Sequence, residues 1–244
     1  MANWQDPQVT GHDTATIGVP RAARDAGLRS YLLKVYNYMA SGVLLTGIVA
    51  MGFAESGYAA QVFSGGGILP WVIILSPLAI VFAMSFGAAR MATSTLQMLF
   101  WAFAGLMGLS MSTIFLVYTG TSIAQTFFAV TAAFLGLSVY GYTTKRDLSG
   151  FGTFLIMGVV GIIVASLLNL LIFKSGAMAM AISAIGVLLF AGLTAYDTQK
   201  IKSIYFQVAG TDMMGKTAIL GALNLYLDFV NMFQFLLSFM GNRR

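Results

Sequence analysis

Two aspartates lie inside apolar stretches of this 244-residue sequence, and their types and positions suit proton or ion chemistry. Asp197 lies in Ala195-Tyr196-Asp197-Thr198-Gln199-Lys200, and Asp228 lies within the apolar run 221–235. A carboxylate at the centre of a bilayer costs about 3 kcal/mol on insertion scales, so a buried acid of this kind needs a partner or a function. Both side chains are therefore candidate proton-binding or ion-binding groups.

Two amide side chains accompany Asp228 on one face of its predicted helix. At about 100° per residue, Asn224, Asp228 and Asn231 fall within about 60° of one another, and Gly221 precedes them on the same face. We expect Gly221 to admit a close neighbouring helix, and Asn224 and Asn231 to donate hydrogen bonds to Asp228. Because this face cannot lie against lipid, the last helix is expected to be surrounded by the others.

A close approach of Asp197 and Asp228 would create a site that changes its charge near neutral pH. Two carboxylates within about 6 Å do not both ionise easily, and they titrate as one unit. Two interpretations without a function remain open at this point. In one, Asp197 pairs with Lys200 at the wet headgroup level; in the other, Asn224 and Asn231 hold Asp228 permanently neutral.

The remaining residues predict neither an enzyme nor a cofactor. The sequence has no cysteine and one histidine, His12, in a polar N-terminal segment, so Ser-His-Asp and HExxH sites are not expected. Two aspartates, two asparagine carbonyls and water fall short of the roughly six to eight oxygens of a tight calcium site. We therefore expect only a weak calcium contact at Asp197 and Asp228, with calcium as a permeant ion.

The composition is that of an integral membrane protein, with 58% apolar and 9% charged residues. Apolar runs of about 18 residues or more recur from Tyr31 onward, and each is long enough to cross a hydrocarbon core of about 30 Å. The alternating segments of a membrane barrel are absent from the sequence, so an all-α fold is expected. The net charge of +5 comes from basic residues at predicted helix ends, which indicates membrane topology rather than nucleic-acid binding.

Seven transmembrane helices are predicted in this way. Their approximate ranges are 31–54, 70–88, 96–118, 123–142, 151–173, 178 to beyond 197, and 216–240. Residues 1–28 are expected to form a flexible cytoplasmic tail, and residues 29–244 the transmembrane domain.

Basic residues predict the orientation. Most of the 13 lysines and arginines fall on the side of the N-terminus, which places that terminus in the cytoplasm. They are Arg21, Arg24, Arg29, Lys34, Arg90, Lys145, Arg146, Lys200, Lys202 and Lys216. A full crossing by the last helix would put Arg243 and Arg244 on the opposite side, and re-entry would put them on the same side. We expect a full crossing, because no proline turns the segment back.

The predicted depths of Asp197 and Asp228 differ by two or three helical turns if both helices start at the membrane face. The difference closes if the last helix begins deeper, within the polar segment 207–215. It also closes if the sixth helix extends further inward. The sequence leaves both possibilities open.

With these motifs, residues 30–240 resemble the Bax inhibitor-1 family of transmembrane proteins. The most specific parts are Ala195-Tyr196-Asp197-Thr198-Gln199 and Leu223-Asn224-Leu225-Tyr226-Leu227-Asp228-Phe229-Val230-Asn231. The resemblance implies two three-helix layers around a central seventh helix. It also implies a pH-sensitive calcium leak in which Asp197 and Asp228 exchange a proton. The family's arginine latch to the first aspartate would correspond to Arg90.

The expected function is therefore a leak of calcium or a similar cation through the inner membrane, gated by protonation of the two aspartates. The expected partners are the lipid bilayer and the permeant cation. Two alternatives remain open. Some bacterial relatives bind and restrain a membrane protease, which implies a non-conducting modulator, and the same carboxylates would also serve a proton-coupled transporter.

Overall fold

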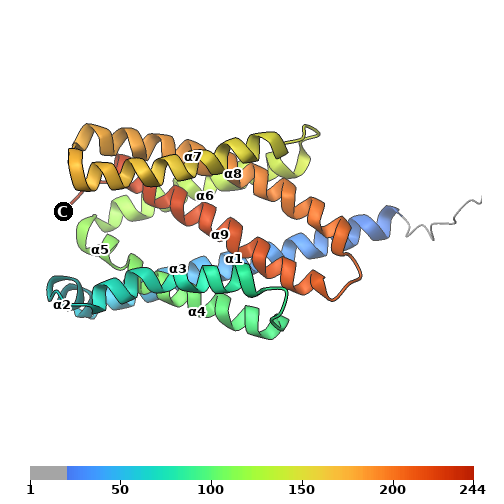
Figure 1. The fold of residues 1–244 in the computed structure, drawn as a ribbon, viewed down its shortest axis with the longest axis horizontal. Helices are drawn as coiled ribbons and strands as arrows, with labels where there is room; N and C mark the ends of the chain where they lie inside the picture. Colours follow the sequence, from blue (N-terminus) through green and yellow to red (C-terminus); the bar gives the residue numbers. More distant parts are fainter. Residues whose placement is uncertain (1–20) are drawn as a thin grey trace, which may run out of the picture.

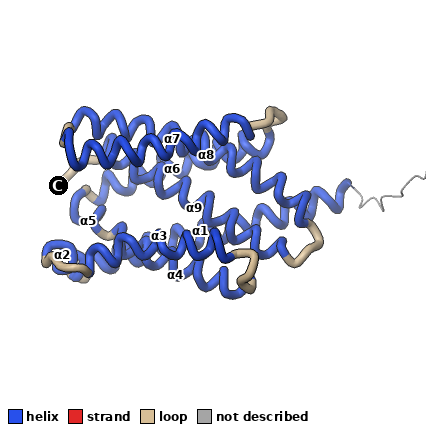
Figure 2. Tube along the Cα trace, in the orientation of Figure 1, coloured by secondary structure: helices blue, strands red, loops and turns tan. Residues whose placement is uncertain are grey.

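The computed structural model describes residues 21–244, with side chains from Asp25 onward, and nearly all of this part is helical (Figure 2). Within it, seven helical segments are long and apolar enough to cross a membrane, which confirms the predicted all-α membrane protein. They are α1 (Arg21–Glu55), α3 (Leu69–Gly87), α4 (Thr93–Met111) continued by α5 (Thr113–Val117), α6 (Gly120–Thr143), α7 (Ser149–Leu168) continued by the π-helix η1 (Asn169–Phe173), α8 (Gly176–Val208) and α9 (Met213–Met240).

Helix boundaries differ from the predicted spans in three places. α1 begins at Arg21 rather than near Tyr31, because the Ala- and Arg-rich segment before the span favours helix even though it is polar. A short helix, α2 (Tyr58–Ser64), forms in the predicted loop 55–69. The third span is interrupted at Ser112, whose hydroxyl donates to Leu109 O at 2.7 Å. Residues 1–20 of the predicted tail, with His12, lie outside the described residues.

Two groups of three helices pack on opposite sides of α9 (Figure 1). In one group α4 packs against α1 and α3, and in the other α8 packs against α6 and α7. α9 contacts α1 and α4 on one side and α6 and α8 on the other. The predicted arrangement of two layers around a central C-terminal helix is confirmed.

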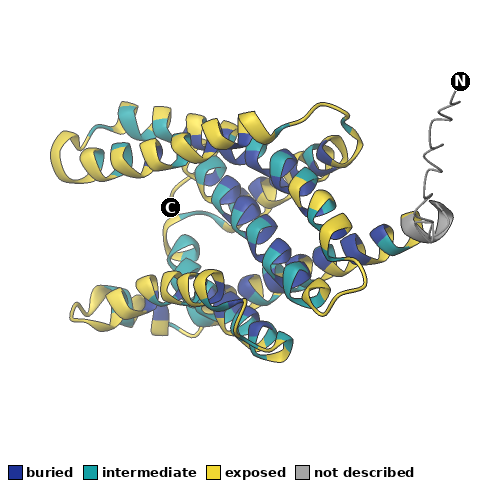
Figure 3. Ribbon diagram, turned by 45° about the vertical axis from the view of Figure 1, so that its right-hand side comes forward, coloured by how far each residue is buried: buried dark blue, intermediate teal, exposed yellow. Residues whose placement is uncertain are grey.

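Burial sets α9 apart from the other helices (Figure 3). In its most apolar stretch 61% of the residues are buried, against at most 33% in any other described span. Its side chains therefore contact protein on nearly all sides, as expected for a helix that is hydrophobic all round. The other spans expose many large apolar side chains, which suits contact with lipid.

The two ends of the bundle differ in charge. α9 crosses the whole bundle, and the residues after it pair with the turn between α5 and α6: Thr119 N donates to Asn242 O (3.1 Å) and Arg244 N to Val117 O (2.9 Å). The predicted full crossing is therefore confirmed. At the opposite end lie most of the described basic residues, and we call this the basic end. They are Arg29, Lys34, Arg90, Lys145, Arg146, Lys200, Lys202 and Lys216.

Candidate functional site

Asp197 and Asp228 meet where α8 packs on α9, the most extensive helix contact in the described chain. α8 continues past Asp197 as far as Val208, and α9 begins at Met213, well before Asp228. At 1.5 Å per residue, the two aspartates differ in distance from the basic end by about 6 Å, or roughly one turn. Extension of the sixth span to Val208 is what brings the depths together, because the start of α9 at Met213, within the polar segment 207–215, by itself moves Asp228 further from the basic end.

The two carboxyl groups lie close enough for each to act on the other. Asp228 is 4% exposed and Asp197 is 9% exposed. Asp228 Oδ2 is fully buried and finds no hydrogen-bond donor among residues 21–244. Two ionised carboxylates offer only acceptors, so a bond between them requires that one is protonated. In this packed arrangement the two carboxyl groups can therefore form a hydrogen bond to each other only when they share a proton.

Nearby hydroxyl groups are already engaged. Thr194 Oγ1 donates to Phe190 O at 2.8 Å, and Thr198 Oγ1 donates to Thr194 O at 2.8 Å. Each hydroxyl carries a single proton, so neither threonine has one left for Asp197. The carboxyl pair thus depends on its own proton.

Lys200 lies one turn beyond Asp197 and is near enough for its charge to act on that carboxyl group. Its Nζ, however, lies over the ring of Tyr196, 5.8 Å from the ring centroid. Asp197 is buried against α9 rather than at a wet helix end. The interpretation in which Asp197 simply pairs with Lys200 at the headgroup level therefore does not describe this structure.

The predicted roles of Asn224 and Asn231 are wrong. Asn231 Nδ2 donates to Leu227 O, one turn earlier on the same helix, at 2.8 Å. Within residues 21–244 neither amide supplies the donor that Asp228 Oδ2 lacks. Polar side chains in helices often bond to the local backbone instead of to each other, and Asp228 meanwhile faces α8. The interpretation in which these amides hold Asp228 neutral is therefore excluded.

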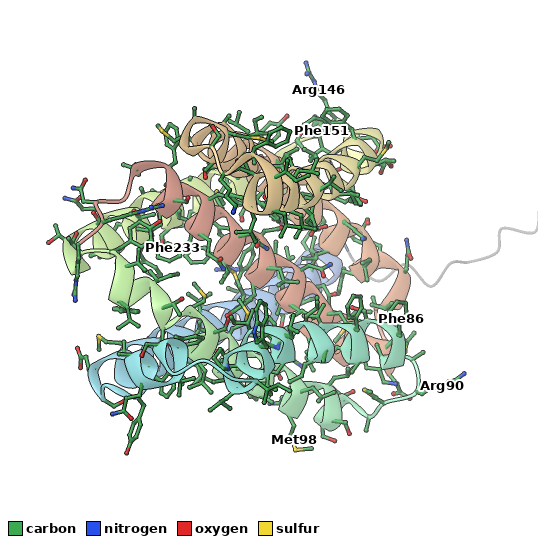
Figure 4. All side chains as sticks on the ribbon, turned by 60° about the vertical axis from the view of Figure 1, so that its left-hand side comes forward. Phe86, Arg90, Met98, Arg146, Phe151 and Phe233 are labelled. Atoms are coloured by element: carbon green, nitrogen blue, oxygen red, sulfur yellow. The ribbon has the colours of Figure 1, made fainter. Side chains whose placement is uncertain are left out.

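Arg90 does not reach the site either. It is exposed in the turn between α3 and α4 and points away from the bundle (Figure 4). Asp197 belongs to the other three-helix group and faces α9. The latch expected between Arg90 and Asp197 is not formed in this arrangement, because the two residues lie in different groups with α9 between them.

Glycines bring the helix backbones together around the two aspartates. Gly221 on α9 faces α8, where an added Cβ would lie 3.1 Å from Ile201 Cγ1, so the predicted close neighbour is confirmed. Gly141 on α6 lies against the backbone of α8 at Ala195, two residues before Asp197, and a Cβ there would overlap the Ala195 carbonyl oxygen. Gly141 was not predicted from the sequence, because the residues around it do not indicate which helix packs against α6.

A second buried polar group, also missed, lies on another side of α9. Tyr226 OH and Thr46 Oγ1 are 2.6 Å apart, and Thr46 Oγ1 donates to Ala104 O at 2.8 Å. Tyr226 is therefore the donor to Thr46. These bonds connect α1, α4 and α9. Tyr226 stood in the motif around Asp228, but a threonine within an apolar span gives no signal that it is the tyrosine's partner.

Fold and site together define the class: a multi-pass helical membrane protein with a buried carboxyl pair between its last two helices. A family model described as inhibitor of apoptosis-promoting Bax1 matches residues 28–244. The chain therefore belongs to the Bax inhibitor-1 family.

Bacterial proteins match nearly the whole chain. The uncharacterized protein RP147 of Rickettsia prowazekii is 49% identical over 223 residues, which cover 90% of this chain and 92% of the relative. Inner membrane protein YbhL of Escherichia coli K12 is 45% identical over 221 residues, which cover 90% of this chain and 94% of the relative. Together with the seven apolar helical segments, these relatives support a multi-pass membrane protein.

Proposed function

We propose that this protein is a pH-sensitive cation leak channel of the inner membrane, with calcium as the expected ion, gated by the proton shared between Asp197 and Asp228. One observation carries the proposal: the two carboxyl groups are buried against each other, and Asp228 Oδ2 has no donor within residues 21–244. An acid in this position is expensive to keep in a membrane. Proton-dependent gating would be a function that requires a buried acid at this position.

Loss of the shared proton supplies the force that opens the site. Two negative charges about 4 Å apart repel by about 4 kcal/mol at the effective dielectric constant typical of proteins. That is a substantial fraction of the stability of a folded domain. The repulsion acts across the contact between α8 and α9, so deprotonation favours their separation next to the central helix.

The ionised pair then attracts a cation without retaining it. Two carboxylates offer at most four oxygens, whereas calcium takes roughly six to eight ligands. Residues 21–244 contain no group of three or more His, Cys, Asp or Glu side chains that would complete a tight site. Water completes the coordination shell, and weak binding allows rapid release.

Charge at the helix ends supports an orientation for this channel. The basic end carries the start of α1, so the positive-inside rule favours the proposed orientation, with the N-terminus in the cytoplasm. Asp197 lies about 16 Å from the basic end of α8. In this orientation the pair responds to the pH of the cytoplasm through the inner ends of α8 and α9.

Calcium flux into proteoliposomes tests the proposal across a pH series on both sides of neutrality. Wild-type flux is expected to rise with pH as the shared proton is lost. Asp228→Asn is expected to show low flux at every pH, because an amide donates to Asp197 without titrating. Asp147→Asn is the matched control, since Asp147 is exposed in the loop between α6 and α7 and should leave the pH response unchanged.

Other results of the same experiment favour the other functions. An absence of cation flux at every pH excludes the channel and favours a non-conducting protein that modulates a membrane protease. Saturable flux of another solute, coupled to proton movement, favours a transporter that uses the same carboxyl pair. In that case Asp228→Asn should uncouple proton movement from solute movement.

A further inference from the structure

A groove that opens sideways from the bundle runs between α1 and α6. Both helices pack against α9 but barely against each other, so α9 forms the floor of the groove at Phe229. Its central part has a volume of about 520 Å³ and is lined by apolar side chains, with Thr131 and Tyr36 as the polar ones. A second cavity of about 400 Å³ continues toward the basic end, and the two share Tyr36 and Leu135.

We propose that this groove binds one glycerophospholipid with an anionic headgroup. Its phosphate lies at Arg29, its glycerol ester region lies at Ser138, and one acyl chain extends along α9 between α1 and α6. The site involves neither Asp197 nor Asp228, so it stands whether or not the protein conducts ions.

One residue that lines the cavity at the basic end carries an unpartnered, buried donor. Ser138 lines this cavity, its side chain is 5% exposed, and its Oγ has no hydrogen-bond partner among the described residues. A buried hydroxyl without a partner is unfavourable, so a ligand oxygen at this position would stabilise it. Ester and phosphate oxygens of a phospholipid are acceptors of the required kind.

Charge at the mouth of the groove selects an anionic headgroup. Arg29 lines the cavity beside Tyr142, and none of the side chains described as lining either part of the groove is acidic. Lys202 adds a second positive charge: its Nζ donates to Tyr142 O at 2.7 Å and lies 4.7 Å from the centroid of the Tyr142 ring. Basic side chains at the membrane surface bind anionic lipids in preference to zwitterionic ones.

The apolar part of the groove has the length of an acyl chain. From Ser138 to Phe127, α6 rises by about 16 Å, which is about half of a hydrocarbon core of roughly 30 Å. A chain from a lipid of the leaflet at the basic end would therefore run along Leu135 and Thr131 toward Phe127. Soluble phosphate would leave this apolar length empty, which favours the lipid as the occupant.

Site-specific fluorescence quenching in vesicles tests the proposal. The chain has no cysteine, so Thr131→Cys and Val160→Cys each accept a single fluorophore. Thr131 lines the groove, whereas Val160 is 58% exposed on α7 at a similar depth from the basic end. The full chain is reconstituted into mixed dioleoyl phosphatidylcholine and dioleoyl phosphatidylglycerol, with bromine on the acyl chains of one lipid at a time.

Brominated phosphatidylglycerol is expected to quench the Thr131 position several-fold more strongly than brominated phosphatidylcholine at the same mole fraction. At Val160 the two lipids should quench equally, because that surface contacts bulk lipid. If the ratio of quenching by brominated phosphatidylglycerol to quenching by brominated phosphatidylcholine is the same at Thr131 and Val160, the proposal is wrong.

Variants at the mouth of the groove test which side chains bind the lipid headgroup. Arg29→Gln should abolish the phosphatidylglycerol preference at the Thr131 position and Ser138→Ala should reduce it. Lys34→Gln should retain it, because Lys34, unlike Arg29, lines neither part of the groove. A preference that survives Arg29→Gln, or that soluble glycerol phosphate removes, would contradict the proposal.

A variant inside the groove covers the case in which Arg29→Gln does not fold. Ala40 lines the apolar part of the groove and is exposed, so Ala40→Trp fills space without entering the core. It should reduce quenching by both brominated lipids at Thr131 and leave quenching at Val160 unchanged. Undiminished quenching at Thr131 in this variant would show that no acyl chain occupies the groove.

Discussion

Two sides of α9 hold buried polar groups in opposite states. Toward α1 and α4, Tyr226 donates to Thr46 and Thr46 donates to Ala104 O, so each donor has an acceptor. Toward α8, Asp228 Oδ2 has no donor within residues 21–244. The first group stabilises one packing at every pH. The second lacks such a donor, and in the proposed gate a proton shared with Asp197 would supply it.

Two of the helix contacts in the bundle also differ in kind. Phe100 and Phe103 of α4 pack edge-on against Tyr226, with centroid separations of 6.4 and 5.0 Å. In the other group, the backbones of α6 and α8 touch at Gly141 and Ala195. The first contact is made by large side chains, which can shift when a neighbour is substituted. The second is made by backbone, which cannot, so it should tolerate substitution less well.

The largest expected effect is that of Gly141→Leu. A side chain at this position would overlap the Ala195 carbonyl oxygen, and backbone cannot move aside as a flexible side chain can. We expect a loss of about 3 kcal/mol or more and little monomeric protein after extraction in detergent. Gly136→Leu on the same helix is the control, because nothing lies within 4 Å of a Cβ there. Equal melting temperatures for the two variants would contradict the close backbone contact.

Thr46→Val should have the next largest effect. It keeps the volume of the side chain but removes the acceptor of Tyr226 OH and the second hydrogen bond to Ala104 O, at a cost of about 2 kcal/mol. Tyr226→Phe removes one bond and should cost about 1 kcal/mol. Because the hydroxyls form one group, the double variant should cost less than the sum of the two, as measured by thermal unfolding in detergent. Strict additivity would show that the bonds act separately.

Asp228→Asn should change stability at neutral pH by less than about 1 kcal/mol, because Asp228 Oδ2 has no hydrogen-bond partner within residues 21–244 to lose. The variant should differ from wild type in the pH dependence of its stability. Wild-type stability should fall as rising pH removes the shared proton, whereas the variant keeps its hydrogen bond throughout. Unfolding series at several pH values measure both effects. A stability loss larger than that of Thr46→Val would place Asp228 among the structural polar groups.

The smallest expected effect belongs to Asp147, a carboxylate outside the membrane spans. Ser149 donates to it, with Ser149 N at 2.9 Å from Asp147 Oδ1, and these bonds lower the pKa of Asp147. A lowered pKa contributes stability above the unfolded value of about 3.9, and this contribution is lost as pH falls through the folded value. Asp147→Asn keeps a neutral acceptor that does not titrate, so it should be slightly less stable than wild type near neutral pH and match wild type in acid. Unfolding curves from neutral to acid pH measure this, and a difference that appears only in acid would contradict it.

Much of the fold follows from the sequence, because hydrophobic length is a local property. An apolar run long enough to cross the bilayer must form a helix to satisfy its backbone, so the spans and the central position of the last helix were predictable. The same reasoning identified Asp197 and Asp228, since an acid in such a run is conspicuous. Gly221 was predictable as well, because a small residue on the polar face of a helix admits a neighbour.

Only the tertiary structure decided which groups meet at the site. The polar segment after Lys202 continues α8 to Val208, and this extension brings Asp197 to the depth of Asp228. Asn231 turns to its own backbone and Arg90 points away from the bundle, although both have the chemistry to bind a carboxylate. Residue type and helical period determine what a side chain is able to bind. Its actual partner depends on where another helix, distant in sequence, is packed, and no local pattern carries that information.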